Sequence, residues 1–108
     1  KSTTNMWGDW MGVVHGDEIE YVFGHPLNNS LNYKESEREL SLRMITAYSR
    51  FATHGKPMLE EGDWPPYTRD QPYYYTFNAE KTGAMGKGPR TTACAFWNEF
   101  LPRLKGVP

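Results

Sequence analysis

The residues best suited to chemistry lie together in "WMGVVHGDEIEYVFG", residues 10–24. A histidine such as His15 can act as a general base when a nucleophile and an orienting acid lie beside it. It follows an apolar run, residues 11–14, that is expected to be the end of a buried strand, and it precedes Gly16, which allows a sharp turn. Open α/β sheets hold ligands and catalytic groups at such strand ends. A lone histidine also suits a packed or surface position, so the residues alone leave both interpretations open.

Partners for His15 are harder to find in the sequence. Asp17, Glu18 and Glu20 follow it, but residues so close in sequence rarely point back at the imidazole, which favours solvated or structural carboxylates. No GxSxG nucleophile elbow occurs in the 108 residues. HExxH and CxxC spacings are missing as well, so we expect no metal site. The glycines of residues 79–90 do not match a phosphate-binding motif, so we expect a surface loop there and no cofactor.

The element that should support this segment is a long helix. Apolar residues recur at helical spacing between residues 35 and 53, with Asn32 and Glu35 as a capping arrangement and Gly55 as the stop. Residues 17–24 alternate partly as a strand would, yet they are short enough for a helical turn, so both remain possible.

The second half of the chain is predicted to contain a strand and another helix. Residues 56–72 hold several prolines and glycines and should be irregular, whereas residues 73–77, "YYYTF", predict a short edge strand. An apolar stripe predicts a helix over residues 91–105, with Thr91 or Thr92 as the N-cap. Pro102 should kink this helix or end its regular part.

Composition narrows the class of protein. Aromatic residues make up 15% of a polar chain whose mean hydropathy is −0.75. That content argues against disorder and indicates apolar faces that pack against something absent. A net charge of −1 without a basic cluster excludes a typical nucleic-acid-binding protein. No apolar run is long enough to span a bilayer.

Two features favour an extracellular setting. Cys94 is the only cysteine and is either a buried thiol or one half of a disulfide. The sequon Asn28-Asn29-Ser30 permits N-glycosylation at Asn28, although such triplets also occur by chance.

Residues 7–29, "WGDWMGVVHGDEIEYVFGHPLNN", resemble the segment around the triad histidine of the cholinesterases. The likeness continues through "FATHGKP", "GDWPPY", "YYYTFN" and "ACAFWNEFLPRL". It implies that residues 1–108 are not an independent domain. They would be the C-terminal portion of one catalytic α/β-hydrolase domain, which has a doubly wound, mostly parallel sheet. The nucleophilic serine, the triad glutamate and the oxyanion-hole glycines would lie upstream.

The resemblance also implies residue roles. His15 matches the general base, and Trp7 matches an aromatic residue on the choline side of the site, where a ring face attracts a quaternary ammonium; core packing is the alternative for Trp7. Asp17 matches a substrate-binding position near the choline moiety. It departs from the tyrosine of vertebrate members and looks like the insect type. A carboxylate there would exchange stacking area for a negative charge, which puts vertebrate substrate and inhibitor preferences in doubt. Glu18 matches a buried glutamate that supports the active site. Cys94 matches a half-cystine whose partner lies upstream.

The implied function is that of a serine esterase that hydrolyses acetylcholine to choline and acetate and so terminates cholinergic transmission. Such an enzyme would be extracellular and synaptic, secreted or held at the membrane by an anchor outside this chain. The last helix resembles one that joins two subunits, with a contact stripe formed by Phe96, Phe100 and Leu104. The alternatives are a cholinesterase-like adhesion protein without catalysis and an autonomous binding module. The fragment alone is expected to be inactive.

Overall fold

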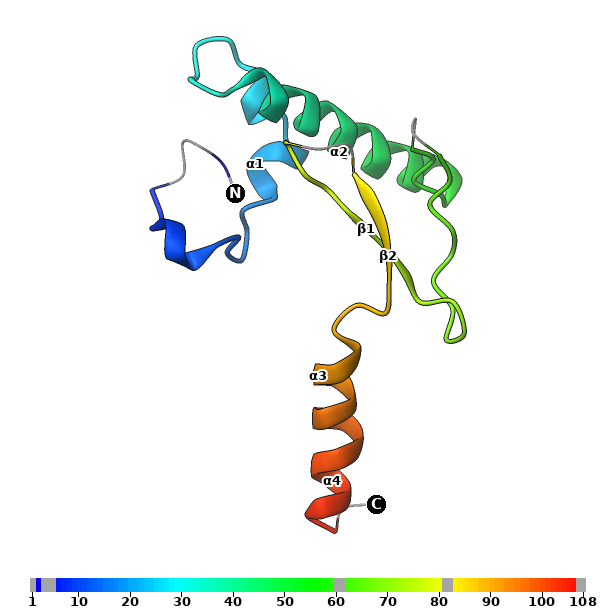
Figure 1. Ribbon diagram of the computed structural model, residues 1–108. Coiled ribbons are helices and arrows are strands. Elements are labelled where there is room, and N and C mark those ends of the chain that lie inside the picture. The colour runs from blue at the N-terminus through cyan, green and yellow to red at the C-terminus, as the bar shows by residue number, and fades with distance from the viewer. Residues whose placement is uncertain (1, 3–5, 60–61, 81–82, 107–108) are drawn as a thin grey trace.

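The computed structural model describes residue 2 and residues 6–59, 62–80 and 83–106 (Figure 1). Two longer helical bodies are joined by a β-hairpin. The elements run in the order η1 (Asp9–Met11), α1 (Ile19–Val22), η2 (His25–Leu27), α2 (Glu35–His54), β1 (Tyr73–Thr76), β2 (Ala84–Lys87), α3 (Thr91–Ala95), η3 (Phe96–Phe100) and α4 (Leu101–Leu104).

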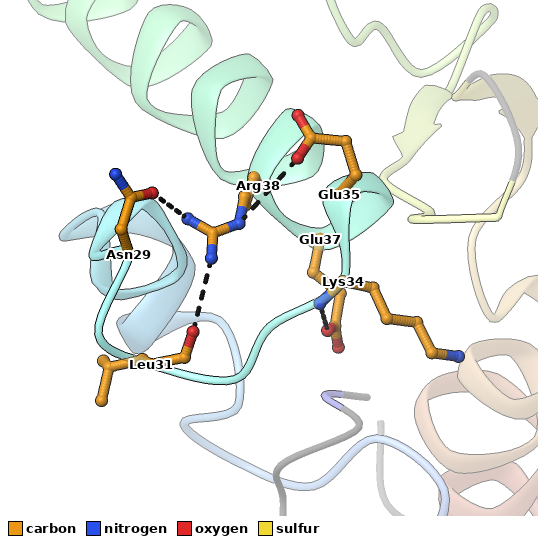
Figure 2. Close-up of polar contacts among 6 residues, drawn as sticks. All are labelled: Asn29, Leu31, Lys34, Glu35, Glu37 and Arg38. Atoms are coloured by element: carbon orange, nitrogen blue, oxygen red, sulfur yellow. Dashed lines mark hydrogen bonds and ion pairs between the residues drawn. The ribbon is translucent and has the colours of Figure 1, made fainter.

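Helix α2 forms where the amphipathic pattern predicts it and carries most of the buried side chains. Leu40, Met44 and Ala47 lie on its buried face at the helical spacing. The helix ends at Gly55, whose φ of 72° is the left-handed conformation that favours glycine. The predicted cap at Asn32 and Glu35 is wrong: Lys34 is the N-cap, and its backbone N–H donates to Glu37 Oε2 at 2.9 Å (Figure 2).

The core lies between α2 and the short helix α1. Tyr21 of α1 packs with Leu40 and Met44, and Phe77 and Ala79 pack against this cluster. Residues 17–24, left open between strand and helix, therefore form a helical turn that buries Tyr21. In Figure 1 α1 lies directly under the N-terminal half of α2.

The predicted strand at residues 11–14 is wrong. The 3-10 helix η1 occupies Asp9–Met11, Gly12 follows with a φ of 63°, and Val13 is 72% exposed. An apolar run becomes a buried strand only when neighbouring strands cover it, and no such strand lies among the described residues.

The only sheet formed by the described strands is an antiparallel hairpin, in which β1 pairs with β2 and Tyr74 lies opposite Gly86. Strand β1 confirms the prediction for "YYYTF". Strand β2 corrects the surface loop predicted for residues 79–90. Gly86 makes the strand hard to predict because glycine is uncommon in strands. The Tyr74 ring needs the space beside it, since an added Cβ would overlap Tyr74 Cζ.

The C-terminal helix extends away from the rest of the chain (Figure 1). Segments α3, η3 and α4 follow one another without a break, and among the described residues they contact no other helix or strand.

Pro102 neither kinks nor ends this helix as a whole, but its regular α-helical part gives way to the π-helical segment η3. The N–H of Leu101 donates to the Phe96 carbonyl five residues back. This wider turn accommodates a proline that lacks an N–H and would crowd the carbonyl four residues earlier. The N-cap is Arg90, not Thr91 or Thr92.

The chain is extended for its length. Its radius of gyration is 17.3 Å, whereas a compact domain of about 110 residues has roughly 13 Å. The buried apolar side chains are few, and most large hydrophobic residues of the described segments are exposed. No described helix is both long and apolar enough to cross a membrane.

Candidate functional site

His15 lies in a tight turn that leads into α1. The N–H of Asp17 donates to the Val14 carbonyl at 3.2 Å, which places His15 and Gly16 at the two central positions. Gly16 has a φ of 86°, whereas His15 is not among the residues with positive φ. This combination is typical of a type II turn, which requires glycine at its third position. The sharp turn expected at Gly16 is therefore confirmed.

Asp17 closes the same turn with its side chain. One carboxylate oxygen, Oδ2, accepts the backbone N–H of Val14 at 3.0 Å. The turn is thus held by a backbone bond in one direction and a side-chain bond in the other, much as a capping box holds a helix end. No described residue hydrogen-bonds to the exposed His15 imidazole, so its place follows from the backbone of the turn.

Trp7 and Asp17 line one open cleft beside this turn. The cleft has a volume of about 550 Å³, and its wall includes Gly16, the residue next to His15. Trp7 is 49% exposed, so it is not packed as a core side chain. An aromatic face together with a carboxylate can attract an organic cation. The structure therefore brings together two residues that the resemblance places near the choline group, beside the turn that carries His15.

The other predicted residues are more dispersed. Glu18 is exposed, and no described residue hydrogen-bonds to its carboxylate, so the burial implied by the resemblance is not present in this structure. Cys94 is an exposed free thiol in α3. Asn28 is exposed, and its side-chain oxygen accepts the Ser30 N–H at 2.9 Å. A disulfide at Cys94 and a glycan at Asn28 remain predictions.

A side-chain clamp holds the sequon loop (Figure 2). Arg38 of α2 donates to Asn29 Oδ1 at 2.8 Å and to the Leu31 carbonyl at 3.3 Å, and its Nε lies 3.9 Å from Glu35 Oε2. Sequence reasoning missed this clamp because Arg38 lies nine residues from Asn29, beyond any local motif.

The cleft also contains residues that sequence reasoning did not assign. Glu20, Phe23 and His25 also line it, together with Met6 and Ile19. A sequence signal for Glu20 and Phe23 was their spacing: Glu20 lies four residues after Gly16, and Phe23 lies four residues after Ile19, so each pair would share one side of a helix. His25 lies beside Pro26, a pairing that predicts a turn and not a ligand site.

A larger cavity of about 860 Å³ lies between the C-terminal half of α2 and residues 56–58 and 63–67. Its wall includes Trp64, whose ring centroid lies 5.3 Å from that of Tyr75. The prolines and aromatic residues of "GDWPPY" were the sequence signal. No three His, Cys, Asp or Glu side chains of the described residues gather closely enough to hold a metal ion.

Comparison with known proteins adds a family to this geometry. The model of the carboxylesterase family matches residues 1–97. An acetylcholinesterase from Leptinotarsa decemlineata is 62% identical over 105 residues, which cover 97% of this chain and 16% of that protein. Acetylcholinesterases from Bungarus fasciatus and Gallus gallus are 47% and 46% identical, over 96% of this chain and 18% and 14% of theirs.

The chain thus spans less than a fifth of the length of each of these relatives. The family match nevertheless covers nearly all of this chain, and the identity extends over 97% of it. The chain belongs to the carboxylesterase family.

Proposed function

We propose that the complete protein is a serine esterase that hydrolyses acetylcholine to choline and acetate, and that His15 is its general base. The observation that carries the proposal is the position of His15 in a doubly closed turn whose foot forms one wall of the cleft with Trp7 and Asp17. The family's α/β-hydrolase fold would supply the serine and the triad acid from outside residues 1–108. These residues would then be the C-terminal portion of one domain.

The chemistry follows from the free imidazole. His15 would take the proton of the serine hydroxyl as the serine oxygen attacks the acetyl carbon, and would then give it to the choline oxygen as the C–O bond breaks. In the second half, His15 would take a proton from the water that attacks the acetyl carbon, and would give it to the serine oxygen as the acetyl–serine bond breaks and acetate leaves. The Trp7 ring and the Asp17 carboxylate would hold the ammonium group meanwhile.

The first experiment is an activity assay on the complete protein. We expect hydrolysis of acetylcholine, together with covalent labelling by a serine-directed phosphonate. A folded protein that neither hydrolyses the ester nor takes up the label would contradict the proposal and favour the adhesion-type alternative.

Replacing Asp17 with asparagine should raise KM for acetylcholine by about fivefold, the size expected for a partly solvated charge pair. Asparagine keeps an oxygen that can accept the Val14 N–H, so the turn stays closed. The control substrate is the uncharged dimethylbutyl acetate, in which carbon replaces the ammonium nitrogen, and its KM should not change. An equal rise in KM for both esters would show that Asp17 acts through the turn and not through its charge.

Replacing Gly16 with alanine should lower the free energy of unfolding by about 1 kcal/mol, because its φ of 86° disfavours any side chain. The matched control is Gly55→Ala, which has a φ of 72° and open space around the new methyl group. Both variants should unfold at lower temperature, but only Gly16→Ala should lower kcat. Equal kcat values in the two variants would separate the turn from catalysis.

The C-terminal helix suits a contact with a second copy. Phe96 and Phe100 stack with centroids 5.9 Å apart, and Leu104 continues the same exposed stripe. Exposed apolar stripes of this kind are typical of helix–helix interfaces. We propose that this stripe forms the homodimer, that Cys94 pairs with an upstream cysteine and that Asn28 carries a glycan. Such an enzyme would work outside the cell, at synapses, secreted or held by an anchor outside residues 1–108.

A further inference from the structure

A buried polar contact joins α1 to α2. The Tyr21 hydroxyl donates to Glu37 Oε1 at 3.2 Å, and the Ser41 hydroxyl donates to the Tyr21 carbonyl at 2.6 Å. We call Tyr21, Glu37 and Ser41 the α1–α2 latch. Their exposed fractions are 4%, 2% and 0%. The latch is thus shielded from water. In such a buried place a hydrogen bond is stronger than in water, and a broken one costs more free energy.

The Glu37 carboxylate is well satisfied despite its burial. Besides the Tyr21 hydroxyl, it accepts the Lys34 N–H at 2.9 Å through Oε2, and it lies in the first turn of α2, where the helix dipole favours a negative charge (Figure 2). Burial, and next the Glu37 carboxylate, raise the pKa of Tyr21, so the phenol stays protonated and remains a donor. The Tyr21 hydroxyl thus donates to a carboxylate that is held in place at the start of α2.

The latch lies at the base of the turn that carries His15. Ile19 N–H donates to the Gly16 carbonyl at 3.1 Å, and the N–H groups of Tyr21 and Val22 both donate to the Glu18 carbonyl. Together with the Val14–Asp17 bonds, these contacts make residues 14–23 one hydrogen-bonded unit. The His15 backbone lies within that unit, so the point from which the imidazole extends moves with it.

A second contact supports the same arrangement from the side. The Tyr33 hydroxyl donates to Glu20 Oε2 at 2.7 Å, and the rings of Tyr21 and Tyr33 meet edge to face with centroids 6.5 Å apart. Glu20 lines the cleft, so this contact joins the wall of the cleft to Tyr33, two residues before α2 begins.

We propose that Tyr21 and Glu37 are positioning residues for His15: their buried contact sets where α1 lies on α2 and thereby places the imidazole. This inference rests on the proposed esterase function. Reacting groups need placement within a fraction of an ångström, and a displacement of about 1 Å can cost about a hundredfold in rate. A contact that only stabilised the fold would change how much protein is folded, but not how fast each folded active site turns over.

The test uses the complete protein, with kcat expressed per active site counted by phosphonate titration. Tyr21→Phe removes one oxygen and should lower kcat about tenfold, and Glu37→Leu should lower it about a hundredfold, with KM for acetylcholine within about twofold. Glu37→Gln should restore most of the activity, because the amide can accept the Lys34 N–H and donate to the Tyr21 oxygen. The matched control is Tyr48→Phe, at an exposed α2 position whose hydroxyl bonds to no described residue, and it should leave kcat unchanged.

Two results would overturn the inference. One is a kcat per site within twofold of wild type in Tyr21→Phe and in Glu37→Leu alike, accompanied only by a lower unfolding temperature. The other is a Tyr48→Phe variant as slow as Tyr21→Phe. Tyr21→Phe removes a single oxygen, so it decides the test by itself if Glu37→Leu does not fold. An inactive wild-type protein would instead refute the proposed function, on which the inference rests.

Discussion

Replacing His15 with alanine in the complete protein should lower kcat for acetylcholine by several orders of magnitude, about 10⁴-fold or more. Removing the base leaves no group to take the serine proton, and removal of a triad member has effects of this size in other serine hydrolases. Folding should be largely unaffected because the His15 side chain is exposed and makes no hydrogen bond to a described residue. Steady-state kinetics on purified protein, with unfolding temperature measured alongside, checks both statements.

The matched control for this variant is His54→Ala. His54 is an exposed histidine at the end of α2, remote in sequence from the cleft. Its replacement should leave kcat within about twofold, since an exposed side chain without a buried contact contributes little. A His15→Ala enzyme that retained activity within tenfold of wild type would show that His15 is not the base.

The second large effect concerns residues 1–108 as a separate molecule, which should show no esterase activity and no cooperative unfolding. The core consists of little more than Tyr21, Leu40 and Met44, and the C-terminal helix packs on none of the described elements. Ordering the backbone costs about 1–2 kcal/mol per residue, and so small a core cannot offset that. Near-UV circular dichroism and tryptophan fluorescence during a urea titration provide the measurement.

The complete protein, measured in the same titration, is the reference. We expect a sharp transition and resolved near-UV bands for the complete protein and a gradual, featureless change for the fragment. A single cooperative transition with sharp near-UV signals in the fragment would contradict this prediction. It would favour an autonomous module over a portion of a larger domain.

Local sequence signals predicted the elements that local interactions determine. Helix α2 has an amphipathic pattern along its 20 residues, and a glycine follows directly at its end. Both signals are local in the sequence. The turn at Gly16 was predictable because only glycine adopts its backbone conformation without strain.

The elements that depend on distant partners were missed. Strand β2 contains Gly86 because the Tyr74 ring of β1 occupies the space, and no pattern within residues 79–90 reveals that ring. The apolar residues 11–14 predicted a buried strand, yet Val13 is exposed because nothing in the described chain covers it. Burial is a property of the whole fold, and a short apolar run does not reveal what lies above it.

The candidate site divides in the same way. The spacing of Trp7 and Asp17 in the sequence does not predict that they lie in one cleft. Only the family resemblance placed both near the choline group. The α1–α2 latch joins residues 16 and 20 positions apart, so it too was beyond any sequence motif. Contacts across such distances are made by the packing of α1 on α2, which the sequence pattern does not specify.

The most direct test of the central claim is to react the complete protein with a serine-directed phosphonate and to locate the adduct by peptide mass spectrometry. We predict an adduct on a serine outside residues 1–108, formed at least about a hundredfold more slowly in His15→Ala. An adduct on a serine within residues 1–108, or an unchanged rate in the variant, would contradict the claim that this chain supplies the general base to a serine elsewhere in the protein.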